Sequence, residues 1–222
     1  MKKFAVVFLA FALLCGAALA ETVYVTITDG QGAICLAYSE VEVSDVDGDG
    51  AITIYDALYC AHAANYADGA EAGFAAEDQG YGPSLTKLWG EENGGSYGYC
   101  VNNASAMSLA DAVAEGDHVQ AYAYQDLEAW SDQFSYFELT GDDGEGTYTL
   151  TLNTIAHDAD WNPVVAPVAG ATITLDGEDS DLVTGEDGSV SVTLPEARPY
   201  TVSAHCDEIV LVPPVIVLGA DE

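Results

Sequence analysis

The 222-residue sequence carries 37 acidic and only four basic side chains, a formal charge of −33 at neutral pH. Nucleic acids and anionic membranes bind proteins through clustered lysines and arginines, so this balance excludes both as expected partners. Half of the residues are hydrophobic and a tenth are aromatic, which is enough for a packed core and argues against disorder.

Residues 1–20 predict a secretory signal peptide. Lys2-Lys3 form the charged start, Phe4–Leu14 the apolar run, and Ala18-Leu19-Ala20 the small-residue cleavage site. The apolar run is too short to span a bilayer. We therefore expect cleavage after Ala20, secretion, and no transmembrane anchor. Removal of the peptide leaves two basic residues against 37 acidic ones, a formal charge of −35.

The first half of the remaining chain predicts strands around one main helix. Alternating apolar residues favour a strand at Thr22–Thr28, and Asp29–Gly32 is typical of a turn. Segments 34–38 and 41–43 together predict the returning strand. The other elements are expected at the following positions: strands at 97–101, 118–124, 135–139 and 147–155, a helix at 53–66, and a short helix at 108–114.

A twelve-residue segment before the main helix has the spacing of a calcium loop. Asp45, Asp47 and Asp49 occupy positions 1, 3 and 5, Gly50 occupies the sharp turn at position 6, and position 7 offers the Ala51 carbonyl. Asp56 closes the loop at position 12. Calcium requires six or more hard oxygens at roughly 2.3–2.6 Å, and alternate side chains of a tight loop can supply them. Ile52, at position 8, is expected to turn into the core.

The same residues have a plainer interpretation, an Asp/Gly-rich surface turn. Thr53 would then cap the helix and Asp56 would be the acid of a capping box. We expect the metal site because a turn does not require three alternating aspartates. The loop resembles the calcium loop of dockerin modules, which also use Asp at position 12. The resemblance implies calcium binding; it does not imply cohesin recognition, because Ile54-Tyr55 replace the usual Ser/Thr pair and no second loop follows.

Three short motifs extend the resemblance across residues 21–140. They are Thr53–Leu58 (TIYDAL), Gly95–Asn102 (GSYGYCVN) and Glu115–Val119 (EGDHV). Together they resemble the transcobalamin C-terminal-like domain of secreted bacterial proteins. The resemblance implies a β-grasp fold for residues 21–161, and vertebrate relatives use this domain to help enclose cobalamin.

The last part of the chain predicts a small, separate β domain. Short alternating stretches separated by Asp-Gly turns are typical of a β-sandwich, which we place at residues 162–222. Residues 163–212 resemble carboxypeptidase-regulatory-like and pilin-type Ig-like modules. The expected fold class is therefore α+β followed by all-β: a β-grasp-like domain with one main helix, then an Ig-like β-sandwich.

Four cysteines remain after the signal peptide, at positions 35, 60, 100 and 206. In an exported protein they permit two disulfides, in any of three pairings, or one disulfide with two buried thiols.

Other candidate sites are weaker. His157–Asp160 offers a second metal site or a solvated loop. The aromatic residues offer a sugar-binding or planar-ligand surface, or one face of a sheet packed on the core: Tyr97, Tyr99, Tyr122, Tyr124 and Trp130. No nucleophile elbow, zinc motif or phosphate loop is present.

These observations predict a secreted, non-catalytic, calcium-binding module for extracellular or cell-surface binding and adhesion. Its partner would be a protein, glycan or small molecule. The alternative is a small-ligand (corrinoid-like) or carbohydrate-binding protein.

Overall fold

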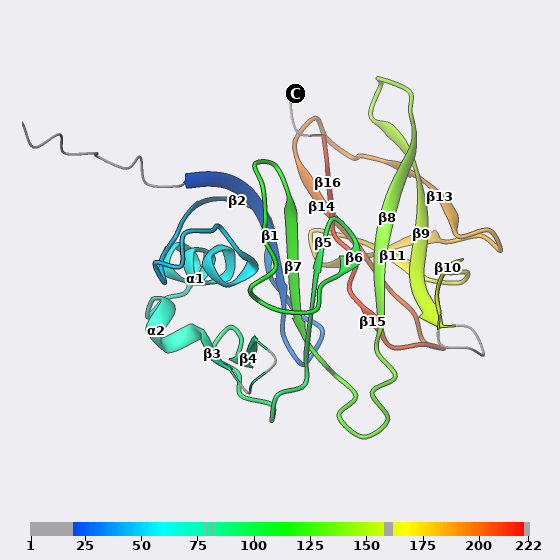
Figure 1. Cartoon of the computed structure of the whole chain (residues 1–222). Helices are drawn as coiled ribbons and strands as arrows, with labels where there is room; N and C mark the ends of the chain where they lie inside the picture. The colour runs from blue at the N-terminus through cyan, green and yellow to red at the C-terminus, as the bar shows by residue number, and fades with distance from the viewer. Residues whose placement is uncertain (1–19, 79, 81, 158–161, 220–222) are drawn as a thin grey trace, which may run out of the picture.

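A computed structural model describes residues 20–78, 80, 82–157 and 162–219. The predicted signal peptide, apart from Ala20, and most of the His157–Asp160 segment lie outside these residues. The described chain is mainly β-strand, with few helices and several sheets (Figure 1). No helix in the described part is both long enough and apolar enough to cross a membrane.

The first half forms a five-stranded mixed sheet in the order β2-β1-β7-β5-β6. Its strands are β1 (Ala20–Thr28), β2 (Ile34–Ser44), β5 (Tyr97–Val101), β6 (Ala104–Ser105) and β7 (His118–Ala123). Strand β1 runs antiparallel to β2 and parallel to β7, and β7 runs antiparallel to β5. The strands predicted at 22–28, 97–101 and 118–124 are confirmed. The returning strand predicted from segments 34–38 and 41–43 is confirmed as β2.

Helix α1 (Ile54–Asn65) packs on one face of this sheet (Figure 1). The alternation in β1 turns Val23, Val25 and Ile27 toward the helix, where all three are fully buried. On α1, the spacing of Ile54, Leu58 and Ala61 places them on the face that meets the sheet. The predicted helix and its capping residue, Thr53, are confirmed.

A connecting region follows α1 and covers the end of the core. It contains a short helix α2 (Ala70–Gly73) and a hairpin of β3 (Ala75–Asp78) and β4 (Pro83–Lys87), from which Phe74, Leu85 and Leu88 are buried.

The prediction of a helix at 108–114 is wrong. This segment is non-helical because its backbone forms hydrogen bonds with residues at the start of α1. The amide of Ile54 donates to the carbonyl of Asp111, and the amide of Tyr55 donates to the carbonyl of Leu109. The amide of Val113 donates to the carbonyl of Ile52. The carbonyls of the segment thus satisfy amides that the first turn of a helix leaves without internal partners.

The second half contains two further sheets that share one core. One sheet has the order β10-β9-β8-β15, with β13 also paired to β9, and the other has the order β12-β11-β14-β16. Residues from both sheets, including Leu150, Leu152, Ile173 and Val202, are fully buried in this core. The bounds are β8 (Gln133–Asp142), β9 (Thr147–His157), β10 (Pro163–Pro167), β11 (Thr172–Leu175), β12 (Glu178–Val183), β13 (Ser189–Thr193), β14 (Tyr200–His205), β15 (Leu211–Val212) and β16 (Ile216–Leu218).

Strands β8 and β9 were expected in the first domain (21–161) or at its seam, and they contribute residues both to the second core and to the cluster between the two halves. They pair with β15 and β13, and their residues Phe137, Leu150 and Leu152 pack in the second core. The two cores therefore divide between β7 and β8, before the expected boundary. A strand's own sequence fixes which of its faces is apolar and leaves its pairing partner open.

A small aromatic cluster joins the two halves. Cys100 and Tyr122 of the first sheet pack against Phe134 and Val212 of the second half. On the same face of the first sheet, Thr26 is buried although its side chain points away from α1. Both faces of the first sheet are therefore covered, one by the helix and the other by the second half of the chain.

Candidate metal centre

The loop between β2 and α1 brings three of the predicted ligands together. Asp45, Asp47 and Asp49 each offer a carboxylate oxygen, and these oxygens lie within 4.8 Å of one another. Asp45 is half-buried, and the other two are exposed. The sharp turn expected at Gly50 is present, with φ of 91°. This backbone conformation favours glycine, which has no Cβ to clash.

Hydrogen bonds from the loop's own backbone hold the three carboxylates in place. The amides of Gly48 and Gly50 donate to the two oxygens of Asp45, at 2.7 and 3.0 Å. The amide of Asp49 donates to Asp47 at 3.1 Å, and that of Ala51 donates to Asp49 at 2.8 Å. A carboxylate oxygen that accepts one hydrogen bond keeps a second lone pair, so these bonds leave capacity for a cation.

The electrostatics of the loop favour a cation. None of the ion pairs among the described residues involves Asp45, Asp47 or Asp49. The pKa of Asp47 is raised above its ordinary value, first by partial desolvation and then by the neighbouring carboxylates of Asp49, Asp56 and Asp45. Close like charges disfavour ionisation, and a divalent ion placed among them would remove that repulsion.

Asp56, predicted at position 12, has a different local role. Its side chain is fully buried. One carboxylate oxygen accepts hydrogen bonds from the Thr53 amide (2.9 Å) and hydroxyl (2.8 Å), and the other accepts from the Val46 amide (2.8 Å). With the Asp56 amide donating to the Thr53 hydroxyl, this arrangement is a capping box. Thr53 and Asp56 therefore have the capping role that the plainer interpretation gave them, and the three clustered aspartates lie beside them.

Asp56 also ties the start of the loop to the helix, because Val46 lies next to Asp45. The far end of the loop is anchored by Ile52, which is buried in the first core as expected. The participation of Asp56 and of the Ala51 carbonyl in metal binding stays a prediction. The residues present fit calcium in chemistry, since all are hard oxygen donors, and in spacing along the loop.

The aromatic residues proposed as a ligand surface are dispersed. Tyr122 is buried and Tyr124 packs beside it in the cluster between the two halves. The Tyr97 hydroxyl donates to backbone carbonyls and accepts from the Asn93 amide. Tyr99 packs on the first core, whereas Trp130 is 67% exposed on a separate loop. The four tyrosines thus pack inside the protein, but on both faces of the first sheet rather than on one: Tyr97 and Tyr99 against the first core, and Tyr122 and Tyr124 between the two halves.

Cys35, Cys60, Cys100 and Cys206 are unpaired thiols in the structure, so neither of the disulfide arrangements that the sequence permits is formed. Burial raises the pKa of the Cys35 thiol to about 11 and that of Cys100 to about 12. Neither would be a thiolate at neutral pH, so neither is an activated nucleophile.

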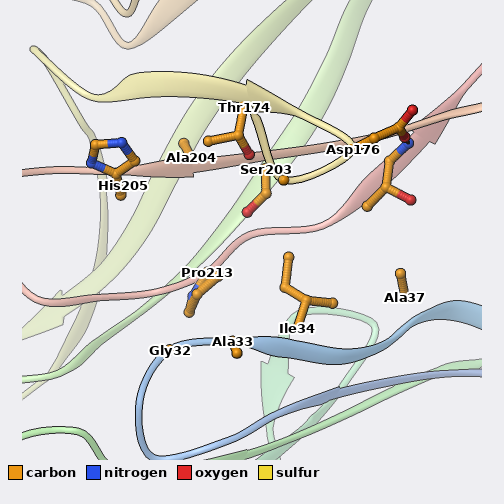
Figure 2. Close-up of a pocket in the computed structure, with 12 residues that line it drawn as sticks. Gly32, Ala33, Ile34, Ala37, Thr174, Asp176, Ser203, Ala204, His205 and Pro213 are labelled. Atoms are coloured by element: carbon orange, nitrogen blue, oxygen red, sulfur yellow. The ribbon is translucent and has the colours of Figure 1, made fainter. Parts of the chain in front are cut away.

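A groove of about 580 Å³ lies between β2 and the sheet that contains β11 and β14. Figure 2 shows the residues that line it. Ala33 and Ile34 form one side, Thr174, Ser203 and His205 the other, and Pro213 also lines it. His205 pairs with Asp179 across 3.0 Å. Ser203, Thr174 and Thr201 also line the groove, but among the described residues no hydrogen bond joins their hydroxyls to His205. The groove has room for a small polar molecule, but its lining contains no hydrogen-bonded nucleophile–base pair and no Phe, Tyr or Trp ring.

No family model matches the chain, and neither a curated protein nor a solved structure does.

Proposed function

We propose that the chain is a secreted, non-catalytic protein that binds one calcium ion in the loop 45–56 and acts as an extracellular or cell-surface binding module. The observation that supports this function is the convergence of Asp45, Asp47 and Asp49 just before the capped start of α1. An ion held there would fix the loop against the helix that fills the first core.

The strand arrangement supports the fold assignments within this proposal. In the first sheet the initial strand pairs in parallel with β7, and α1 lies between the opening hairpin and the later strands. That order is consistent with a β-grasp domain. Two sheets around one core are consistent with an Ig-like β-sandwich, which would then include β8 and β9.

Calcium would contribute a measurable part of the stability. If the dissociation constant is about 0.1 mM and the ambient concentration about 1 mM, binding to the folded state alone adds about 1.4 kcal/mol. For a unit of roughly 100 residues this corresponds to a rise of about 5–10 °C in melting temperature.

A double substitution, Asp45→Asn with Asp49→Asn, tests the proposal. Melting curves in EDTA and in about 1 mM calcium should show a stabilisation of the wild-type protein that the variant lacks. The matched control is Asp142→Asn with Asp143→Asn. These residues lie in another Asp/Gly-rich turn with similar backbone hydrogen bonds, so the charge change is the same. An equal calcium response in the wild type and the Asp45/Asp49 variant would reject the site.

A further inference from the structure

A second groove, of about 350 Å³, lies where β2, the β5–β6 turn and β7 face β8 and β16. Its lining includes the polar residues Tyr38, Asn103, His118 and Tyr136 and the apolar residues Phe137 and Ile216. We propose that this groove binds an uncharged sugar residue of a glycan. The inference goes beyond calcium binding and uses none of the residues of the metal centre.

Tyr38 is placed at the groove by a β-bulge. Val25 pairs with Ser39 and Ile27 pairs with Leu36, so Ala37 and Tyr38 together stand opposite Thr26. Tyr38 has φ of 42°, a conformation that is strained for a bulky side chain. Bulges re-aim side chains and are frequent beside functional sites.

The bulge leaves Tyr38 36% exposed, with its ring beside two other rings. It stacks on Tyr24 at 4.6 Å and meets His118 edge-on at 4.5 Å. The Tyr38 amide is satisfied by the hydroxyl oxygen of Thr26 at 3.1 Å, so the bulged backbone has no unmet donor at this point. The ring is therefore held in one orientation before any ligand arrives, which lowers the entropic cost of binding.

His118 contributes a fixed ring nitrogen. Its Nε2 lies 2.8 Å from the Thr26 hydroxyl, and its Nδ1 has no hydrogen-bond partner among the described residues. Burial lowers the pKa of His118 to about 4, so the ring is neutral at pH 7. In either neutral tautomer Nδ1 can make one hydrogen bond, as a donor or as an acceptor.

Three further polar groups in the lining also lack partners in the described part of the chain: the hydroxyls of Tyr38 and Tyr136 and the amide of Asn103. Asn103 lies in the β5–β6 turn, and its backbone has a left-handed conformation with φ of 65°. Its neighbour Asn102 is already committed to Asp117 and to the His118 amide. These groups can form hydrogen bonds with the hydroxyls of a sugar, and the apolar side chains of Phe137 and Ile216 can contact the apolar face of its ring.

The absence of charged side chains from the groove lining favours a neutral ligand. The residues that line the groove include no aspartate, glutamate, lysine or arginine, although the chain has 37 acidic residues. An anionic ligand would be repelled by the surrounding negative field and would find no cationic partner in the groove. A cation would find no carboxylate there. The groove of Figure 2 is a poorer candidate for a sugar, because its lining has no Phe, Tyr or Trp ring and includes the ion-paired Asp176.

Affinity electrophoresis in native gels tests the proposal with defined probes. The wild-type protein is run through gels that contain soluble β-glucan, mannan, xylan, starch or chitooligosaccharides, with polygalacturonate as the acidic comparison. We expect retardation by at least one neutral glycan, none by polygalacturonate, and the same result in EDTA as in calcium. That last comparison separates this proposal from the calcium site.

Variants locate the binding. Tyr38→Ala should weaken it about tenfold or more, and Asn103→Ala and Tyr136→Phe, which leave the bulge intact, about three- to tenfold. Trp130→Ala, an exposed aromatic residue outside the groove lining, is the matched control and should bind as the wild type does. Circular dichroism confirms that each variant is folded.

Four outcomes would overturn the proposal: no retardation by any neutral glycan, binding unaffected by both Tyr38→Ala and Asn103→Ala, binding lost in Trp130→Ala, or displacement of the glycan by millimolar choline chloride. The third would move sugar binding to the Trp130 loop, and the fourth would make the groove a cation site.

Discussion

Replacement of Asp56 by asparagine tests how the loop is joined to α1. Asparagine keeps the shape of the side chain but replaces one carboxylate oxygen with an NH₂ group. In the wild type both oxygens are used, one by Thr53 and the other by the Val46 amide. Either orientation of the new amide therefore places a donor against a donor at a fully buried position.

The cost follows from these bonds. A buried donor that loses its acceptor costs about 1–3 kcal/mol, and a lost helix cap costs about 1 kcal/mol. We therefore expect Asp56→Asn to lower the free energy of unfolding by about 2–4 kcal/mol, a fall of roughly 10 °C or more in melting temperature. The penalty should be present in EDTA, because it does not depend on a metal ion.

Urea unfolding in EDTA measures this penalty directly. Asp49→Asn is the matched control, because Asp49 is exposed and an asparagine oxygen can still accept from the Ala51 amide. Its loss in EDTA should be within about 0.5 kcal/mol. If Asp56→Asn unfolds at the same urea concentration as the wild type, the account of the capped loop is wrong. If it keeps the full calcium increment, Asp56 is not a ligand.

Two further predictions concern stability. The folded-state pKa of His118 is lowered to about 4 from 6.5, so its neutral form stabilises the fold fully above pH 6.5, and this contribution is lost as pH falls toward 4. The loss reaches about 3 kcal/mol. When urea unfolding is compared at pH 7 and pH 4.5, the wild type should therefore lose more stability than His118→Gln. Equal losses in the two proteins would contradict a buried, neutral His118. Leu58→Ala opens a cavity at a fully buried position of α1 and should lower the free energy of unfolding in urea by about 2–5 kcal/mol. The control Leu139→Ala, at a site 48% exposed, should lower it by less than about 1 kcal/mol. Similar values for the two variants would show that the first core is not packed as described.

Local patterns in the sequence were enough to predict the elements around the metal centre. The alternation of Val23, Val25 and Ile27 defines β1, and Thr53 with Asp56 defines the start of α1. The three aspartates are neighbours along the chain, so their spacing alone was enough to predict that their carboxylates would come together. The double role of Asp56 was visible as two competing interpretations, and the structure shows the hydrogen bonds of the capping one.

The pairing of distant segments could not be predicted in this way. Strands β8 and β9 were recognised as strands, but their partners β13 and β15 lie later in the chain. The segment 108–114 has a composition compatible with a helix, and its contacts with the start of α1 override that preference.

The groove at the junction of the two halves was missed for the same reason. It is lined from five separate parts of the chain, and its key residue, Tyr38, depends on a bulge that leaves no clear sign in the sequence. The one usable signal was a tyrosine at the break between segments 34–38 and 41–43, which together predicted the returning strand.

Calorimetric titration of calcium into the wild-type protein tests the central proposal most directly. About 0.15 M sodium chloride screens diffuse binding to the acidic surface, and the Asp45→Asn, Asp49→Asn variant serves as the reference. We predict one ion per chain with a dissociation constant near 0.1 mM, and no such event in the variant. Titrations that are the same for both proteins, or the absence of saturable binding up to several millimolar calcium, would contradict a metal site in the loop before α1.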